Sequence, residues 1–282
     1  MIRPARRIAG SVVLAMAVLA AVACASPAGA GEPVLRFDAG GGAYLAVPPP
    51  GWNRQSPLGV LMFLHGYRGS AAGITADDAV APVAAGAGLL LVAPEGRDGT
   101  WSHTGSPAHL RDDLAFLHAV ATDLRRRFPV DESRVIAAGF SQGASMVWEL
   151  ACHDAAGFTA FLTFSGGFWE PLPDTCPSGP VVLRHVHGRA DAVVPLAGRM
   201  IRQRFRQGDI FAGMALWRRM DECPDRPDRV TTEQRMLCSE WTTCHSGRLE
   251  LCLHPGGHEM EAQWLAEGLA WAGVDKSPHG GN

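Results

Sequence analysis

The chain has 282 residues, of which 47% are hydrophobic and 19% are charged, and its formal net charge is −3 at pH 7. This length and composition allow one large globular domain or two small ones, and they exclude a disordered chain, a collagen and a coiled coil. The mild negative charge argues against a nucleic-acid partner, because nucleic acids are bound by basic surfaces.

The first 30 residues have the features of an export signal. Three arginines precede an unbroken apolar run over residues 12–23, which is shorter than a usual membrane span. Small residues at 28–30 offer a cleavage site, so we predict a signal peptide over residues 1–30 and a secreted or periplasmic chain over 31–282. An uncleaved anchor and a lipoprotein acylated at Cys24 are the alternatives. We expect no other membrane span.

The six cysteines that follow Cys24 predict a disulfide framework. An even number of cysteines in an exported chain favours three disulfides, whose connectivity the sequence does not fix. We predict pairing between nearest neighbours, which gives Cys152–Cys176, Cys223–Cys238 and Cys244–Cys252. None of these cysteines has the Cys-x-x-Cys spacing of a zinc site, so we predict no metal ion.

Strands and helices alternate along the predicted mature chain. Short apolar runs predict strands at residues 35–37, 44–47, 60–64, 89–93, 135–139, 160–164, 181–187 and 248–254. Helical spacing of apolar residues predicts helices at 110–127, 142–152, 195–207, 210–220 and 259–271. Residues 221–247 are polar and rich in cysteine, which predicts a loop held by disulfides. Residues 209–247 together are predicted to form a disulfide-rich insertion or lid. The alternation predicts one α/β domain with a mostly parallel sheet and helices on both faces.

A nucleophile is predicted at Ser141. The sequence Gly139-Phe140-Ser141-Gln142-Gly143 is the only G-x-S-x-G in the chain, and it follows a predicted strand and opens a predicted helix. The serine of such a motif occupies a strained turn, so glycines two residues away on both sides are needed to avoid clashes. The helix N-terminus also favours the negative charge that develops in acyl transfer.

A serine hydroxyl is a poor nucleophile and needs a base to take its proton, and an acidic side chain orients that base. In chains with this motif, the acid and the base both follow the serine in the sequence. We predict His258 as the base, because Pro255-Gly256-Gly257 forms a loop between the last strand and the last helix. We predict Asp191 as the acid, because it follows the strand at 181–187. Asp174 and Asp209 are rivals, and a helix cap is the alternative role for Asp191. His185 and His187 share one strand face and are expected to line or support the site, with metal ligation as the alternative.

An oxyanion hole needs two hydrogen-bond donors. The backbone N–H of Gln142 follows the nucleophile, and the backbone N–H of Tyr67 lies in the loop after an early strand. Aromatic residues near these motifs are predicted to bind substrate, with packing in the core as the alternative; they are Trp101, Phe140 and Trp169, with Phe168 beside them.

Together these motifs resemble the polyhydroxybutyrate depolymerase and feruloyl or acetylxylan esterase group of α/β-hydrolases, which includes carbohydrate esterase family 1. The matching stretches, between about Val60 and Trp271, are LHGYRGS (64–70), APEG (93–96) with Trp101, VDESRVIAAGFSQGASM (130–146), HVHGRADAVVP (185–195), the cysteines from Cys223, and LHPGGHE (253–259). The resemblance implies the α/β-hydrolase fold, Ser141, Asp191 and His258 as a catalytic triad, secretion, disulfides, and hydroxyalkanoate or hydroxycinnamate esters as substrates. Glu259 and Met260 depart from the group's usual ending, and Tyr67 stands where relatives often have a small residue.

The residues therefore predict a secreted serine carboxylic ester hydrolase that works through an acyl-enzyme and needs no cofactor. The resemblance implies polyhydroxybutyrate-type esters or feruloyl and acetyl esters of polysaccharides as its substrates. Acyl transfer or peptide cleavage by the same triad is one alternative, and a non-catalytic binding protein on a hydrolase scaffold is another. The sequence leaves the individual ester and the oligomeric state open.

Overall fold

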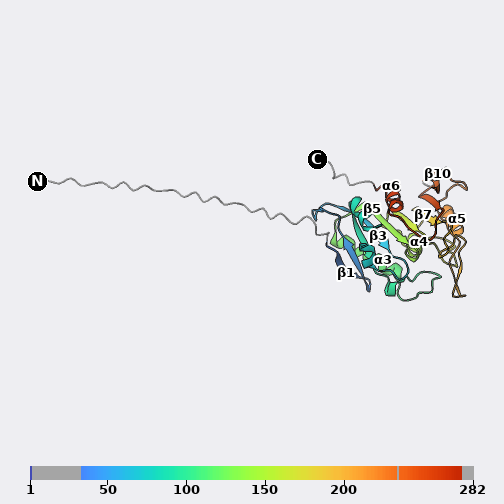
Figure 1. The fold of residues 1–282 in the computed structure, drawn as a ribbon, viewed down its shortest axis with the longest axis horizontal. Coiled ribbons are helices and arrows are strands. Elements are labelled where there is room, and N and C mark those ends of the chain that lie inside the picture. Colours follow the sequence, from blue (N-terminus) through green and yellow to red (C-terminus); the bar gives the residue numbers. More distant parts are fainter. Residues whose placement is uncertain (2–32, 234, 275–282) are drawn as a thin grey trace. The chain divides into compact units, whose positions relative to one another are not determined.

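The computed structural model describes residue 1, residues 33–233 and residues 235–274 (Figure 1). The predicted signal peptide, its cleavage site and Cys24 lie outside the described residues. By its contacts the chain divides into two units, Met1–Gly31 and Glu32–Asn282, and the fold that follows is that of the second unit.

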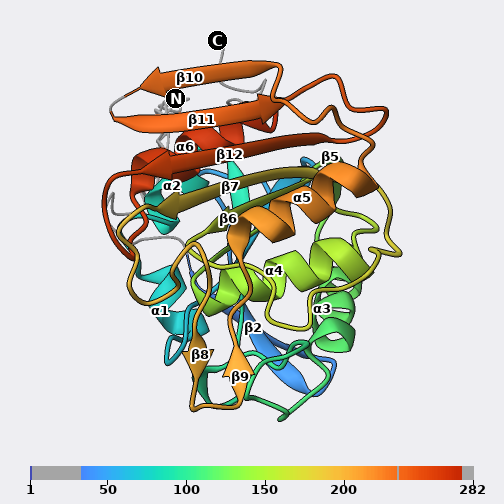
Figure 2. The same ribbon diagram turned by 90° about the vertical axis from the view of Figure 1, so that its right-hand side faces the viewer.

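Ten strands of the described chain form one sheet, in the order β1-β2-β4-β3-β5-β6-β7-β12-β11-β10 (Figure 2). The six central strands, β4 to β12 in this order, run parallel, and the pairs at both edges are antiparallel. The strand bounds are β1 (Leu35–Ala39), β2 (Gly42–Val47), β3 (Leu58–Leu64), β4 (Leu89–Pro94), β5 (Val130–Phe140), β6 (Ala160–Phe164), β7 (Val182–Gly188), β10 (Arg229–Glu233), β11 (Met236–Trp241) and β12 (Arg248–His254).

Helices cover both faces of the sheet, as predicted (Figure 2). One core contains the apolar sides of α3 (Asp113–Arg127), α4 (Gln142–His153) and α5 (Ile210–Met220). The core on the opposite face contains those of α1 (Ala71–Thr75), α2 (Ala81–Gly86) and α6 (Ala262–Trp271). A single 3-10 turn at Arg97–Gly99 follows β4. Because both faces are covered, strands β3, β4 and β6 are buried at every position, which explains their continuous apolar sequences.

Two predicted elements take a different form. The predicted helix at 195–207 is wrong, because this segment contains a small hairpin of β8 (Met200–Ile201) and β9 (Phe205–Arg206). Gly198, Arg202 and Gln203 have positive φ angles of 67°, 50° and 56°, which an α-helix cannot accommodate. The predicted loop at 221–247 instead contributes β10 and β11, which extend the sheet beyond β12.

The cysteines pair as Cys152–Cys176, Cys223–Cys244 and Cys238–Cys252. The predicted pairs Cys223–Cys238 and Cys244–Cys252 are therefore wrong. The reason is the strand register, because Cys238 on β11 lies directly opposite Cys252 on β12. That pairing leaves Cys223, just beyond α5, to join Cys244, just beyond β11.

Within the part of the chain that the structure describes, no helix is both long and apolar enough to cross a membrane.

Candidate active site

The predicted site residues come from loops that follow the carboxyl ends of parallel strands. His65, Gly66 and Tyr67 follow β3, Ser141 follows β5, Asp191 comes after β7, and His258 comes after β12. Parallel strands end at the same edge of a sheet, and in open α/β sheets this edge is where ligands bind. Residues that are far apart in the sequence can therefore meet here.

Ser141 occupies the strained turn that its motif requires. Its φ and ψ angles are 57° and −122°, in a region that non-glycine residues rarely adopt, and it lies directly between β5 and α4. A Cβ atom on Gly143 would lie 2.1 Å from the carbonyl oxygen of Leu64, and one on Gly139 would lie 2.6 Å from the backbone of Gly143. Both glycines of the motif are therefore required by close backbone contacts. Gly166 adds a third, because its Cβ would lie 2.2 Å from the carbonyl oxygen of Ser141.

His258 links the other two residues of the predicted triad. Its Nε2 lies 2.8 Å from Ser141 Oγ, and its Nδ1 lies 2.7 Å from Asp191 Oδ2. The imidazole is slightly exposed and the Asp191 carboxylate is fully buried. With Asp191 holding Nδ1–H, the imidazole presents Nε2 as the acceptor for the serine proton.

The Asp191 carboxylate is fixed by its own turn. Its Oδ1 accepts hydrogen bonds of 2.8 Å from the backbone N–H groups of Val193 and Val194, while Oδ2 faces His258. These two donors were not predicted from the sequence, although an aspartate that binds the N–H groups two and three residues later is a common turn motif. No helix starts at Pro195, so Asp191 does not cap one. The rival Asp209 instead caps α5 through the N–H of Ala212.

The loop after β3 packs against the nucleophile. A Cβ atom on Gly66 would lie 3.3 Å from Ser141 Cβ, so the loop that continues into Tyr67 packs against the serine. Among the described residues, neither the backbone N–H of Tyr67 nor that of Gln142 has a protein acceptor. Both are therefore available to a ligand, as the oxyanion hypothesis requires.

Side chains in the loops around Ser141 hold the backbone segments that carry these two donors. His65 Nε2 accepts from the N–H of Gly96 at 3.0 Å, and Trp101 Nε1 donates to the His65 carbonyl at 2.8 Å. Burial lowers the pKa of His65, in keeping with a neutral ring that accepts a hydrogen bond. The amide side chain of Gln142 is bound by Thr100 and by the Trp101 carbonyl.

The predicted substrate-binding residues differ in their positions. Phe140 lies beside the triad, with its ring centroid 4.9 Å from that of His258. Trp101 is fully buried and anchors the His65 loop, which corrects the prediction that it contacts substrate. Trp169 is 8% exposed and packs against His103, whereas Phe168 belongs to the core between Trp148 and Trp217. The side chain of Tyr67, in the loop after β3, is 56% exposed.

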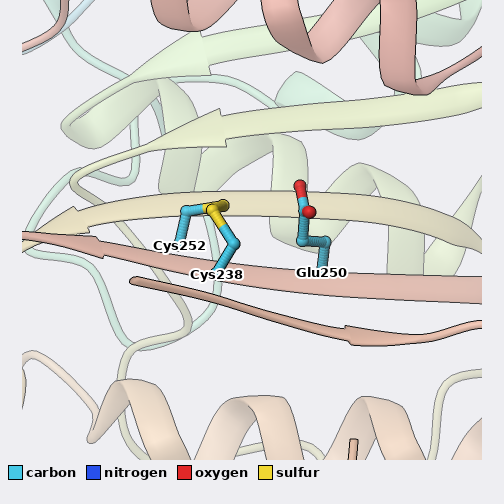
Figure 3. Close-up of side chains that lie close together, drawn as sticks. All are labelled: Cys238, Glu250 and Cys252. Atoms are coloured by element: carbon cyan, nitrogen blue, oxygen red, sulfur yellow. A yellow bond between two sulfur atoms is a disulfide. The ribbon is translucent and has the colours of Figure 1, made fainter. Parts of the chain in front are cut away.

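One cluster has the composition of a metal site. Cys238, Glu250 and Cys252 lie within 4.8 Å of one another on β11 and β12 (Figure 3). The two sulfur atoms are bonded to each other, so neither is a thiolate, and Glu250 forms an ion pair with the buried Arg184. The cluster therefore does not fit a metal ion.

Comparisons with known proteins support the fold. A model of the phospholipase/carboxylesterase family matches residues 115–207. The acetyl xylan esterase from Aspergillus awamori superposes with a TM-score of 0.65 at 13% identity, over 86% of this chain and 100% of that chain. A phospholipase/carboxylesterase from Dyadobacter fermentans superposes with a TM-score of 0.54 at 15% identity, over 80% and 93%. At such identities the superpositions establish the fold alone.

Several of the proteins with similar sequences are named feruloyl esterase C. Feruloyl esterase C of Emericella nidulans is 30% identical over 56% of this chain and 58% of its own length. A probable feruloyl esterase C of Aspergillus niger is 28% identical over 66% of this chain and 70% of its own length. The chain has the α/β-hydrolase fold, and part of its sequence is similar to those of feruloyl esterases. This confirms the predicted fold and the resemblance, although the chain matches little more than half the length of the Emericella relative. The phospholipase/carboxylesterase family model spans Ser141 and Asp191 but ends before His258.

Proposed function

We propose that the protein is a serine carboxylic ester hydrolase, with Ser141 as nucleophile, His258 as base and Asp191 as the acid that orients it. The observation that carries this proposal is the pair of short contacts made by one imidazole, 2.8 Å to the serine and 2.7 Å to the aspartate. The strained turn at Ser141 supports the same assignment, because such a conformation needs a functional reason.

The reaction then follows from the positions of the atoms. Ser141 Oγ attacks the ester carbonyl carbon as His258 Nε2 takes the hydroxyl proton. The oxyanion of the tetrahedral intermediate accepts hydrogen bonds from the N–H groups of Gln142 and Tyr67. His258 returns the proton to the departing alcohol, which leaves an acyl group on Ser141. His258 then takes a proton from water as the water oxygen attacks this acyl group, and it returns that proton to Ser141 Oγ as the bond from Oγ to the acyl carbon breaks and the carboxylic acid leaves.

Feruloyl or acetyl esters of polysaccharides are the proposed substrates. The relatives named feruloyl esterase C and the structural neighbour named acetyl xylan esterase favour this class over polyhydroxybutyrate. The partly buried Phe140 ring, beside His258, and the exposed side chain of Tyr67, in the loop after β3, are the aromatic residues that we propose to contact an aromatic acyl group. We also propose export from the cytoplasm, because three disulfides persist in oxidising compartments.

A substrate panel tests the proposal. Purified protein and its Ser141→Ala variant are assayed on p-nitrophenyl acetate, methyl ferulate, acetylated xylan and hydroxybutyrate oligomers. Ser178→Ala serves as control, because this serine binds the N–H of Ala155 away from the triad and should leave activity unchanged. We expect hydrolysis of ferulate or acetyl esters that falls by at least about 1,000-fold in Ser141→Ala. Folded protein without turnover on any ester would refute the proposal, and ester formation with an added alcohol would indicate acyl transfer.

A further inference from the structure

One chain of hydrogen bonds runs through four buried side chains and ends at the turn after β7. Trp148 Nε1 lies 3.1 Å from Thr163 Oγ1, which lies 2.9 Å from His185 Nδ1. His185 Nε2 lies 2.9 Å from His187 Nδ1, and His187 Nε2 lies 2.7 Å from the carbonyl oxygen of Val194. All four side chains belong to residues with no exposed surface. This series of hydrogen bonds thus connects α4, β6 and β7 with the turn that contains Asp191.

The side-chain protons in this series of hydrogen bonds have one consistent arrangement. The Val194 carbonyl can only accept, so His187 Nε2 carries a hydrogen and its Nδ1 accepts from His185 Nε2–H. His185 Nδ1 is then the acceptor for the hydroxyl of Thr163, whose oxygen accepts from Trp148 Nε1–H. Burial lowers the pKa of His187 and, more strongly, that of His185, which keeps both rings neutral. Both imidazoles are therefore Nε2–H tautomers.

This arrangement leaves no free nitrogen for a metal ion. Each ring nitrogen of His185 and His187 already has a hydrogen-bond partner. Among the described residues, neither histidine belongs to a group of three potential ligands. The alternative of metal ligation therefore has no support. We look instead for the role of His185 and His187 in the residues to which they are hydrogen-bonded.

The pair holds the turn that fixes the Asp191 carboxylate. Val194 is bound on both sides, because its carbonyl accepts from His187 and its N–H donates to Asp191 Oδ1. His187 Nε2 also lies 3.5 Å from Asp191 Oδ2, the oxygen that faces His258. Loss of the His187 donor would leave a buried carbonyl without a partner and free the turn to move.

We propose that His187, oriented by His185, is a positioning residue for Asp191. This inference rests on the proposed function, because it assigns Asp191 to the triad. The two histidines set the place of Val194, and Val194 sets the orientation of the carboxylate that holds His258 Nδ1. The directional hydrogen-bond chain keeps His187 in the tautomer that can donate.

The first test measures the tautomers and needs no substrate. Protein labelled with 15N-histidine is examined by NMR, with resonances assigned through His185→Gln and His187→Gln. We expect both rings to be neutral Nε2–H tautomers between pH 6 and pH 8. A neutral Nδ1–H tautomer or a protonated ring at either position would overturn the inference.

The second test is kinetic. In His187→Phe, we expect kcat to fall about 10- to 100-fold with KM changed less than about twofold, because a small displacement of a catalytic group costs rate rather than binding. His187→Gln retains an amide donor and should recover part of kcat. The control is His103→Phe, since His103 is also buried and its Nδ1 contacts only Thr104 within its own loop. An equal fall of kcat in His187→Phe and His103→Phe would overturn the inference.

A spectroscopic readout separates this inference from the proposed function. The proton between His258 Nδ1 and Asp191 should give a far-downfield 1H resonance in the wild type, and we expect it to shift or broaden in His187→Phe but not in His103→Phe. An unchanged resonance in folded His187→Phe would overturn the positioning role. If the wild type hydrolyses no ester, the proposed function fails, but this resonance still tests the inference. If His187→Phe does not fold, the tautomers measured in the wild type still decide the inference.

Discussion

Glu149 gives the protein a stability that should decrease as the pH rises. Its side chain is 2% exposed, with Thr104 Oγ1 at 3.2 Å and His153 Nε2 at 3.5 Å from Oε2. Burial raises the pKa of Glu149 from 4.5 to about 7. In the unfolded chain the carboxyl loses its proton near pH 4.5, whereas in the folded protein it keeps the proton until about pH 7. The unfolded state therefore binds fewer protons than the folded state in this window, and stability falls as the pH rises through it.

The size of the effect follows from the difference between the two pKa values. About 2.5 pKa units at about 1.4 kcal/mol each correspond to about 3 kcal/mol of stability lost between pH 4.5 and pH 7. Glu149→Gln keeps the shape and the polar group but has no proton to lose. We therefore expect the free energy of unfolding of the wild type to fall relative to this variant by about 3 kcal/mol across the window.

Urea unfolding at pH values from 5 to 8.5 measures this difference. Disulfides are kept intact, and both proteins are followed by far-UV circular dichroism and by tryptophan fluorescence. Glu132→Gln, at an exposed ion pair with Arg125, is the control and should give a curve parallel to the wild type. If the curves of the wild type and Glu149→Gln also stay parallel, the assignment of a protonated, buried Glu149 is refuted.

Three further predictions concern other parts of the fold. Gly143→Ala should destabilise the protein by at least about 2 kcal/mol and remove most esterase activity, because its Cβ would lie 2.1 Å from the Leu64 carbonyl; thermal unfolding and p-nitrophenyl acetate turnover measure the two effects. Asp221 is fully buried and its pKa is raised by burial to about 7, so Asp221→Asn should reduce the loss of stability between about pH 4 and pH 7 in urea titrations, and an unchanged slope would contradict this. Replacing Cys238 and Cys252 together by alanine should cost about 3 kcal/mol of unfolding free energy, since their disulfide closes a loop of 14 residues; peptide mapping of the wild type should recover this pair joined.

The elements that are best predicted from the sequence are the strands that are buried on both faces. Runs such as 60–64 and 89–93 lie between two helical layers, so a continuous apolar run is enough to identify a strand. The strands β10 and β11 were not predicted, because β10 has the polar sequence Arg-Val-Thr-Thr-Glu of an exposed edge. The helix predicted at 195–207 depended on apolar spacing, and that spacing does not reveal the positive φ angles at Arg202 and Gln203. The short helices α1 and α2 were not predicted because they have only five and six residues.

The site was predictable where one motif implies one geometry. The structure brings Ser141, Asp191 and His258 within hydrogen-bond distance, and their catalytic roles stay a proposal. The supporting contacts were less accessible, because they depend on loop paths. Nothing in the local sequence of Trp101 indicates that its indole binds the His65 carbonyl, and the disulfide partners depend on a register that only the paired strands reveal.

The two antiparallel strands beyond β12 have a consequence for the integrity of the site. Strand β12 leads directly to the loop of His258, and it is paired with β7 on one side and with β11 on the other. Without β10 and β11, β12 would be the border of the sheet, with a row of unpaired backbone groups open to foreign strands. Because β11 and β10 are added, the exposed edge strand on this side of the sheet is β10, two strands away from β12. Strands β10 and β11, which belong to the predicted insertion or lid at 209–247, therefore keep the edge of β12 paired on both sides.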